Sequence, residues 1–334
     1  MSRSWVVPTA VEQLAARRRL DASSYCHSPD LEFGLELQLF VPFMYGLYRA
    51  GFTPTIVSRF PKVLFYFGNH REPDESPHAP HARHYHFAPY PLQWRRVYRW
   101  LSYRGVIKWR FWRPKDYARL IAGDMPYWCP PPYRSAFRND RFVFGKDILV
   151  VQNKYTTEPY IYRSLTGRRR HAPYNFIPLD ALDEIFHELK GRYQIIYNRF
   201  TTTIDRSVVQ DLGDFDLIRR RHPEVLTIQD LAERTGRGYN EVQLQVYANA
   251  ERFIGVQGGG SVLLHHFGGK CVVFHRLPPD SYDKILNGQM LLRGQVELQY
   301  RRNCYEELFP RFSGQEIVPK YDLESFRRSV FELF

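Results

Sequence analysis

The sequence predicts an α/β protein with two domains, each built on a doubly wound parallel sheet. Apolar runs of strand length alternate with amphipathic helical segments over most of the chain, which is typical of parallel sheets covered by helices. Late in the chain, a run of three glycines joins a buried strand to a helix. The length of 334 residues is enough for two domains of ordinary size.

The first domain is expected to span 1–145 and to contain a strongly apolar helix over 33–51. Apolar residues recur there at helical spacing, and Gly51 follows as a stop signal. Runs rich in β-branched and aromatic residues predict two strands, at 55–58 and 63–67. The residues before about 30 are expected to form a lead-in with one basic helical stretch.

Prolines interrupt the regular pattern between about 68 and 138, where we expect irregular structure. Within this region, 83–115 interleaves basic and aromatic residues more densely than any other part of the chain. Aromatic faces stack on sugar rings and arginines hold anionic groups, so this stretch is a candidate acceptor platform or membrane contact. The alternative is an amphipathic cover whose Trp and Arg side chains bridge the core and the solvent.

The second domain is expected to span 146–320 and to alternate strands and helices throughout. Its predicted strands are 148–152, 193–197, 225–228, 252–257 and 271–274. Its predicted helices are 179–190, 212–221, 240–250 and 262–267. The chain then ends in a closing segment, 321–334, whose helix is expected to return to the first domain.

Gly258, Gly259 and Gly260 form a tight turn before the helix at 262–267, with Ser261 as the expected N-cap. Backbone N–H groups that open a helix favour an anion, typically a phosphate. The turn is neither the G-x-G-x-x-G fingerprint nor a Walker A loop. We predict that it holds a diphosphate; the alternative is a tight turn that binds nothing.

Polar and basic residues follow the predicted strands of the second domain. Ligands of doubly wound sheets lie beyond the carboxyl ends of the strands, so these residues should line one crevice with the glycine turn. They are Asn153, Lys154, Asn198, Arg199 and Arg206. Each alone fits a surface or capping role, but together they form a cationic, donor-rich rim suited to a diphosphate.

The chain holds 47 Lys and Arg against 35 Asp and Glu, a net charge of +12. This excess favours an anionic partner: a nucleotide, a polysaccharide, a phospholipid surface or a nucleic acid. A hydrophobic fraction of 44% is typical of globular proteins and excludes a disordered chain. No apolar run has the length of a signal peptide or a membrane span, so we expect a cytoplasmic protein with peripheral membrane contact through 83–115.

Two residue types bear on redox state and metals. The scattered cysteines lack a C-x-x-C pair, which predicts free thiols in a reducing compartment: Cys26, Cys129, Cys271 and Cys304. Histidines gather between 70 and 86, but at irregular spacing and without a cysteine among them. A solvated loop is expected there, and a zinc site is the alternative.

Two α/β domains with a late glycine-rich turn and a closing helix resemble the GT-B glycosyltransferases, which have two Rossmann-like domains. Locally, Phe253-Ile-Gly-Val-Gln-Gly-Gly-Gly-Ser261 is similar to the strand–turn–helix of the plant xylosyltransferase and O-GlcNAc transferase family. That family has Gly-x-His-Gly-Ala-Gly, whereas Gln257 replaces its histidine and Gly259 its alanine here. Bacterial heptosyltransferases, with a Gly-Pro pair and a histidine in the comparable turn, are more loosely similar.

Most of the chain also resembles uncharacterised glycosyltransferases of bacteria and large viruses. The shared segments are Phe33-Gly-Leu-Glu-Leu, Pro42-Phe-Met-Tyr, Gln152-Asn-Lys-Tyr, Ile195-Ile-Tyr-Asn-Arg199 and Val256-Gln-Gly-Gly. This likeness implies the fold more strongly than the substrate.

The resemblance implies a transferase of polysaccharide biosynthesis that moves a sugar from a nucleotide diphosphate sugar to a glycan, lipid-linked glycan or other hydroxyl acceptor, with no cofactor. No D-x-D pair stands at a strand end of the second domain, so we expect no divalent metal. The diphosphate would instead meet the glycine turn and the side chains of Asn153, Lys154, Arg199, Arg206, Gln257 and Ser261. Candidate bases for the acceptor hydroxyl are His70, Glu36 and Glu32, although Glu36 fits a structural hydrogen bond equally well.

Two other functions fit the sequence. One is a non-catalytic protein whose basic, aromatic surface binds an acidic glycan or nucleic acid, of which nucleic acid is the less expected partner. The glycine turn would then have only a structural role. The other is an inactive member of the fold that binds a nucleotide without turnover. Many phosphate contacts make binding steeply dependent on salt, so salt dependence separates a nucleic-acid binder from a nucleotide-saturable enzyme.

Overall fold

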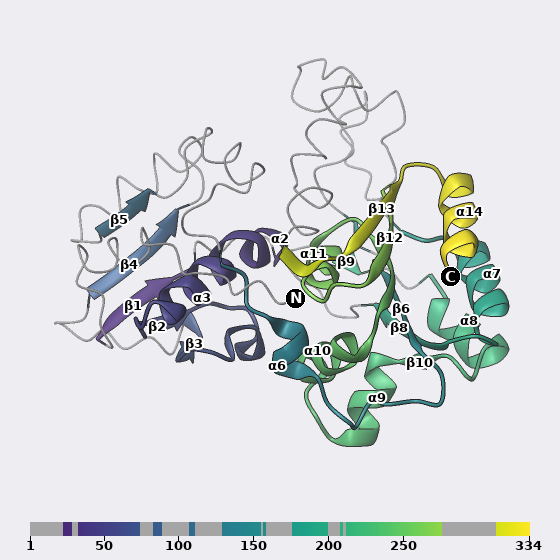
Figure 1. Cartoon of the computed structure of the whole chain (residues 1–334), viewed down its shortest axis with the longest axis horizontal. Coiled ribbons are helices and arrows are strands. Elements are labelled where there is room, and N and C mark those ends of the chain that lie inside the picture. Colours follow the sequence, from purple (N-terminus) through teal and green to yellow (C-terminus); the bar gives the residue numbers. More distant parts are fainter. Residues whose placement is uncertain are drawn as a thin grey trace, which may run out of the picture. The chain divides into compact units, whose positions relative to one another are not determined.

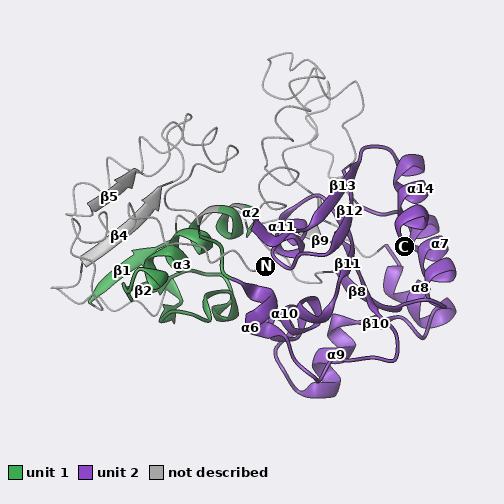
Figure 2. Cartoon of the chain, in the orientation of Figure 1, with its two compact units in different colours: residues 1–131 green, residues 132–334 purple. Residues whose placement is uncertain are grey.

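A computed structural model describes residues 23–28, 33–73, 83–88, 107–110, 129–154, 156–157, 176–199, 208–209, 212–275 and 312–334 (Figure 1). The chain divides into two compact units, 1–131 and 132–334 (Figure 2). This division falls ahead of the boundary expected at 145. The second unit also includes the expected closing segment, 321–334.

Hydrogen bonds hold the segment just after the division to the second unit. Asn249 Nδ2 donates to the carbonyls of Asn139 at 2.8 Å and Phe142 at 2.9 Å. Arg134 donates to the carbonyl of Ala250 at 2.6 Å. These partners are more than a hundred residues away in sequence. These long-range contacts assign 134–142 to the second unit, ahead of the strand where the sequence prediction placed its start.

The first unit contains a parallel sheet with the strand order β3-β2-β1-β4-β5. Its strands are β1 (Ser24–His27), β2 (Thr55–Val57), β3 (His70–Arg71), β4 (Arg83–Ala88) and β5 (Ile107–Arg110). The strand predicted at 55–58 is confirmed as β2. The prediction at 63–67 is wrong: after Pro61 the chain forms a 3-10 helix, η2 (Lys62–Phe65), which buries Leu64 and Phe65.

β4 and β5 correct the prediction of irregular structure between 68 and 138. Both strands lie within the basic, aromatic stretch 83–115. The prolines around them masked a period-two signal in β4, where Tyr85 and Phe87 alternate with His84 and His86. This stretch therefore supplies two strands of the parallel sheet.

The helix predicted at 33–51 is confirmed with one irregularity. α2 (Phe33–Leu35), a π-helical turn η1 (Glu36–Phe40) and α3 (Val41–Arg49) follow one another directly. Pro42 lies in the first turn of α3. Proline has no N–H to donate and its ring crowds the preceding turn, so the wider π turn just ahead of it relieves the conflict.

The second unit contains a six-stranded parallel sheet with the order β10-β8-β6-β11-β12-β13. Its strands are β6 (Ile148–Asn153), β8 (Gln194–Arg199), β10 (Leu226–Thr227), β11 (Arg252–Val256), β12 (Lys270–Phe274) and β13 (Glu316–Lys320). β6, the earliest of these in the chain, lies in the middle, so the order reverses between β6 and β11. This doubly wound order confirms the predicted α/β fold class.

The helices of the second unit are α6 (Tyr133–Phe137), α7 (Leu179–Leu189), α8 (Asp214–Arg221), α9 (Ile228–Thr235), α10 (Tyr239–Asn249), α11 (Gly259–His265) and α14 (Leu323–Leu333). The helices predicted at 179–190, 212–221, 240–250 and 262–267 are confirmed as α7, α8, α10 and α11. The sequence prediction missed α9, although Thr227 and Asp230 form a capping box at its start. A short antiparallel pair, β7 (Thr156–Thr157) and β9 (Val208–Val209), completes the described elements.

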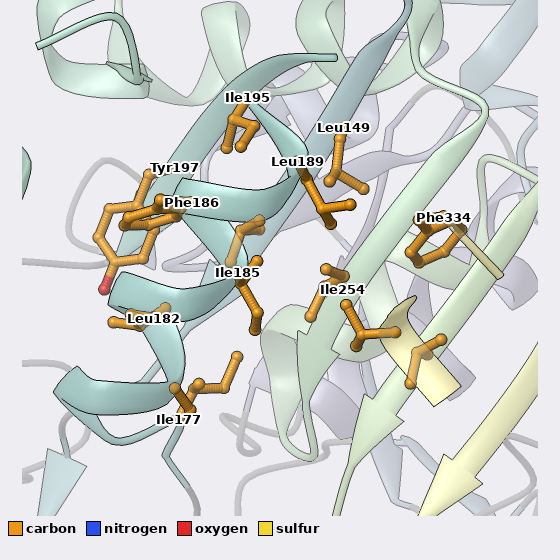
Figure 3. Packing of buried hydrophobic residues seen from close by; sticks show 14 of the residues in the cluster. Leu149, Ile177, Leu182, Ile185, Phe186, Leu189, Ile195, Tyr197, Ile254 and Phe334 are labelled. Carbon is orange, nitrogen blue, oxygen red and sulfur yellow. The ribbon is translucent and has the colours of Figure 1, made fainter. Parts of the chain in front are cut away.

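One hydrophobic core cluster of the second unit lies between its sheet and the helices α7 and α14 (Figure 3). Leu149 and Ile254 from the sheet pack with Phe186 of α7. Phe326 and Phe334 belong to the same cluster, and Tyr193 donates a hydrogen bond to the carbonyl of Phe334 at 2.8 Å. The last helix therefore packs on the sheet of its own unit.

The state of the cysteines and the length of the helices can be checked on the described residues. Cys26, Cys129 and Cys271 are buried free thiols, as predicted, and Cys304 lies outside the described residues. Among the described helices, none is both long enough and apolar enough to cross a membrane.

Candidate functional site

The carboxyl ends of β6 and β11 meet where the strand order of the second unit reverses. Open α/β sheets bind ligands at such a switch point, outside the carboxyl ends of the strands. β6 ends at Asn153, and β11 leads through Gln257 into Gly258. The predicted glycine turn therefore lies at the switch point of the sheet.

The glycine turn passes close to side chains of β6 and the residue after it. Gly258 has a φ of +148°, which favours glycine, and a Cβ there would lie 3.5 Å from Nζ of Lys154. A Cβ at Gly260 would lie 2.5 Å from Nε2 of Gln152. The missing side chains thus allow the close approach, and they leave the ammonium group of Lys154 beside the turn.

The turn carries backbone donors that the described part of the chain does not use. The N–H groups of Ser261 and Val262 donate to the carbonyl of Gly258, at 3.1 and 3.3 Å. No acceptor among the described residues receives the N–H groups of Gly258, Gly259 or Gly260. Three consecutive donors beside an ammonium group are an arrangement that favours an anion.

Ser261 does not have the role that the sequence predicts. The helix begins at Gly259 with Gly258 as its N-cap, and no side chain caps it. Ser261 is buried, and its hydroxyl donates to the carbonyl of Val256. The hydroxyl thus ties the first turn of α11 to the strand before it and is committed to the fold.

The predicted rim residues Asn153 and Asn198 are also buried inside the fold. Asn153 donates to the carbonyl of Ile177 at 3.1 Å and accepts from the backbone N–H of Ile177 at 2.9 Å. Asn198 donates to the hydroxyl of Tyr247 at 2.5 Å and accepts from the hydroxyl of Tyr239. Both amides fix the ends of their strands, because their polar groups are used by neighbouring elements.

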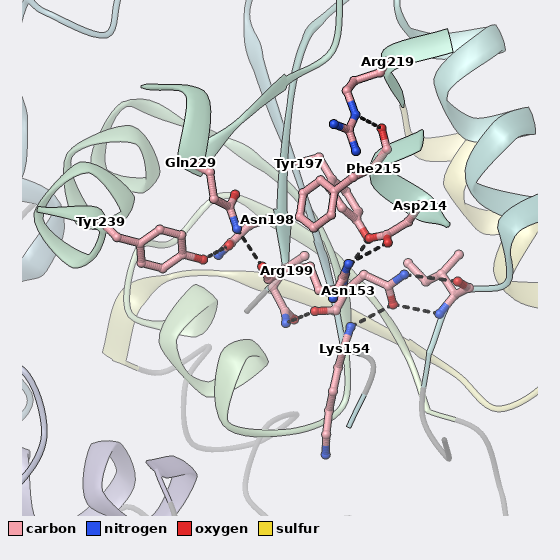
Figure 4. A network of polar contacts seen from close by, with 12 residues as sticks. Asn153, Lys154, Tyr197, Asn198, Arg199, Asp214, Phe215, Arg219, Gln229 and Tyr239 are labelled. Atoms are coloured by element: carbon pink, nitrogen blue, oxygen red, sulfur yellow. Dashed lines mark hydrogen bonds and ion pairs between the residues drawn. The ribbon is translucent and has the colours of Figure 1, made fainter. Parts of the chain in front are cut away.

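Arg199 lies in a buried ion pair (Figure 4). Its Nε and Nη2 donate to the two carboxylate oxygens of Asp214, at 2.5 and 2.7 Å. The hydroxyl of Tyr197 donates to the same carboxylate at 2.6 Å, and the ring of Phe215 lies 4.5 Å from the guanidinium. Asp214 neutralises the charge that we expected to meet the diphosphate, so the geometry favours a structural role for Arg199.

The described site is therefore smaller than the predicted rim. It consists of the turn Gly258–Gly260, the partly exposed Gln257 and the partly exposed Lys154. Arg206 lies outside the described residues. Sequence reasoning missed Gln152, whose buried amide accepts from the N–H of Val256 at 3.5 Å and packs under Gly260. No local signal in the sequence indicates this contact, because about a hundred residues separate Gln152 from the turn.

The first unit places two of the three candidate bases near the carboxyl ends of its strands. Glu36 is buried, and it accepts hydrogen bonds from the hydroxyls of Ser28 at 2.5 Å and Ser58 at 2.8 Å. Ser28 follows β1 and Ser58 follows β2. The carboxylate thus joins two adjacent strand ends, which favours the structural alternative for Glu36. Glu32 lies outside the described residues.

The side chain of His70 in β3 lies beside Ser58 and Phe60, which follow the carboxyl end of β2. Its ring stacks on Phe65 with centroids 5.2 Å apart. Burial lowers the pKa of His70, and hydrogen bonds to the backbone of Ser58 and Phe60 oppose that shift. The imidazole is therefore neutral at pH 7 and can accept a proton. Among the described residues, no cluster of His, Cys, Asp and Glu side chains could hold a metal ion.

No protein-family model matches this chain, and no curated protein sequence matches it. Solved structures do. The iron-containing dodecameric glycosyltransferase TibC from enterotoxigenic E. coli is 14% identical with a TM-score of 0.40, over 81% of this chain and 61% of that one. This chain therefore spans less than two thirds of the length of TibC.

Two further structures cover more of their own length. E. coli ADP-heptose LPS heptosyltransferase II is 9% identical with a TM-score of 0.47, over 86% of this chain and 99% of that one. A family 9 glycosyltransferase from Veillonella parvula is 8% identical with a TM-score of 0.48, over 94% of this chain and 91% of that one. All three of these solved structures are glycosyltransferases.

Proposed function

We propose that this protein is a GT-B-type glycosyltransferase that uses a nucleotide diphosphate sugar as its donor. The observation that carries the proposal is the glycine turn at the switch point of the second unit, where three consecutive backbone N–H groups lie beside Lys154. Such donors are suited to a diphosphate. The local likeness to the plant xylosyltransferase and O-GlcNAc transferase family remains a prediction.

The chemistry of transfer explains why this site suits a donor. When the bond from the sugar to the diphosphate breaks, negative charge grows on the leaving diphosphate oxygen. Fixed N–H dipoles and an ammonium group stabilise that charge without reorganising in the reaction. We therefore expect transfer to continue after chelation of divalent metal, with Lys154 as the main charged contact and Arg206 as a further candidate.

The acceptor hydroxyl needs a base, and His70 is our first candidate. Burial keeps it neutral, whereas Glu36 is buried between two serine hydroxyls. A His70→Asn variant should lower kcat strongly while a nucleoside diphosphate still binds, because the donor site lies in the other unit. Glu32 stays a candidate whose surroundings are outside the described residues.

The acceptor is proposed to be a glycan, a lipid-linked glycan or another hydroxyl compound. We propose that the protein works in polysaccharide biosynthesis in the cytoplasm. The net charge of +12 fits a peripheral contact with an anionic membrane surface through 83–115. Binding to phosphatidylglycerol vesicles that declines with salt would support this contact.

The donor site is tested by thermal stability with UDP, GDP, CDP or ADP, with and without magnesium. A ligand at a hundred to a thousand times its Kd should stabilise the wild type by about 3–4 kcal/mol. Gly259→Asp should abolish the shift, since a carboxylate in the turn repels the diphosphate, and Lys154→Ala should weaken it. Gly191→Asp is the matched control, because Gly191 lies in an open turn of the same unit.

One nucleotide that shifts the wild type and the Gly191→Asp variant, but not Gly259→Asp, would identify the donor base. If no nucleotide shifts the wild type, the donor site is refuted and the basic, aromatic binding protein becomes the better hypothesis. A shift without sugar transfer from any matching donor would instead indicate an inactive member of the fold.

A further inference from the structure

The first unit exposes two tyrosines that belong to one aromatic cluster. Among the described residues, the exposed large hydrophobic side chains are Tyr48, Tyr66, Val143 and Leu179. Tyr48 is 42% exposed and Tyr66 is 40% exposed. Half of this small set therefore lies in a single cluster, although the four positions are spread over both units.

Phe67 is the centre of this aromatic cluster. Its buried ring lies 5.0 Å from the ring of Tyr45, 5.7 Å from that of Tyr48 and 5.5 Å from that of Tyr66. Packing on a buried ring holds the two exposed tyrosines in place, so little side-chain freedom is lost when a ligand binds them.

Polar groups gather at the edge of the same cluster. The rings of Tyr45 and Tyr48 lie 5.9 Å apart, and burial raises the pKa of the Tyr66 phenol, as do the neighbouring phenols of Tyr45 and Tyr48. The guanidinium of Arg49 lies 6.0 Å from the centre of the Tyr45 ring. The surface thus combines aromatic faces with hydroxyl groups and one cation.

The cluster lies at the end of the sheet away from Glu36. α3 connects two parallel strands and runs back between them, so its last residues, including Tyr48, lie at the amino end of β2. Tyr66 and Phe67 come just before β3 and lie at the same end. Glu36 instead bonds Ser28 and Ser58, which follow the carboxyl ends of β1 and β2.

We propose that Tyr48 and Tyr66, with Arg49, form a saccharide-binding site on the first unit. A pyranose ring has an apolar face that packs on an aromatic ring and hydroxyl groups that reach polar atoms at its edge, which matches this surface. Arg49 would hold a ring hydroxyl or an acidic substituent of the sugar. Such a site would hold one part of a glycan acceptor on the first unit.

The size of the surface favours a saccharide over a protein partner. A tyrosine buries at most about 150–250 Å² of surface, so two that are less than half exposed present on the order of 100 Å² each. A stable protein–protein interface needs about 800 Å² from each partner. One or two sugar rings fit the smaller area.

The test is isothermal titration calorimetry of the full chain with neutral cellohexaose and with a galacturonic acid hexamer. Tyr48→Ala and Tyr66→Ala should each weaken binding by about tenfold or more, because a large stacking surface is lost. Tyr48→Phe keeps the ring and should stay within about threefold of the wild type. Arg49→Gln should weaken the acidic hexamer more than the neutral one if Arg49 holds an acid.

Val143→Ala is the matched control, because Val143 is 67% exposed and lies in the second unit. Nucleoside diphosphate shifts in Tyr48→Ala should equal those of the wild type, so this proposal and the donor site can fail separately. The proposal is overturned if neither hexasaccharide binds at millimolar concentration, or if binding survives both alanine variants. It is also overturned if Tyr48→Ala abolishes self-association or binding to phosphatidylglycerol vesicles without changing saccharide affinity.

Discussion

Asp214 and Arg199 form a two-point ion pair inside the second unit, with N–O distances of 2.5 and 2.7 Å and side-chain exposures of 0% and 3%. The pair connects the first turn of α8 to the end of β8. Removing one partner of a buried pair leaves the other charge without compensation, which is far more costly than losing an exposed pair.

Asp214→Asn should therefore lower the free energy of unfolding by about 3–5 kcal/mol. Asp216→Asn is the control on the same helix: Asp216 and its partner Arg219 are 58% and 74% exposed, so the loss should be about 1 kcal/mol or less. Urea denaturation measures both. Equal losses in the two variants would contradict the structural role given to Arg199.

The fold should require glycine at position 260, because a side chain there would collide with the side chain of Gln152. A Cβ at residue 260 would lie 2.5 Å from Nε2 and 2.7 Å from Cδ of that side chain. Gly260→Ala should cost about 1–3 kcal/mol of stability through this crowding. In Gln152→Ala the crowding atoms are gone, so adding Gly260→Ala to that variant should cost at least about 1 kcal/mol less than it does in the wild type.

Denaturant midpoints of the four proteins in this double-mutant cycle supply the measurement. Gly191→Ala serves as the control, since no atom lies within 4 Å of a Cβ placed there. Additive effects of Gln152→Ala and Gly260→Ala would show that the turn does not rest on the Gln152 side chain.

Two buried histidines predict that stability falls in mild acid. Burial lowers the pKa of His265 and of His275 to about 4, from an ordinary value near 6.5. The unfolded chain therefore binds protons more readily than the folded one between these pH values. Their contribution is complete above about pH 6.5 and is lost as the pH falls toward 4.

Between pH 7 and pH 5 each histidine should remove about 2 kcal/mol from the free energy of unfolding. His275→Asn should make this pH dependence shallower, as should His265→Asn. His187→Asn, at an exposed position of α7, should leave it unchanged. Urea denaturation across this pH range is the measurement, and an unaltered slope in both buried variants would refute the prediction.

Asn249 should hold the loop that follows α6. Besides donating to the carbonyls of Asn139 and Phe142, its Oδ1 accepts from the N–H of Asn139 at 3.2 Å. Asn249→Ala should cost about 1–3 kcal/mol, because partly buried backbone groups lose their partners. Amide hydrogen exchange should quicken from 139 to 142, whereas Ser135→Ala, which loses one exposed hydrogen bond, should leave exchange there unchanged.

The sequence was a good guide wherever one element has a strong local pattern. The buried runs of β6 and β12 and the amphipathic face of α7 were predicted within two residues of their bounds. Weak or interrupted patterns misled us: β4 lies among prolines, β13 contains Pro319 and lies at the sheet edge, and η2 is rich in residues that favour strands.

The sequence predicted where the candidate site lies, but it did not predict which residues form the site. Three glycines after an apolar strand and before a helix are a local signal, and they place the turn at a carboxyl strand end. The structure adds that this end is the switch point, because it shows β6 and β11 as neighbours although about a hundred residues separate them. It also shows Gln152 beneath the turn, a contact that no spacing rule indicates.

The structural role of Arg199 could not be predicted from the sequence. Because Arg199 follows a run of apolar strand residues, its neighbours in sequence predict that its charge lies at the ligand-binding edge of the sheet. Its pairing depends on Asp214, which is 15 residues away and meets it only when α8 packs beside β8. Strands, helices and turns follow from patterns among residues that are close together in the sequence. Burial and charge pairing depend instead on contacts that form only when the chain folds. The alternation of elements and the glycine turn therefore follow from the sequence, and the division between structural and ligand-facing polar groups follows from packing.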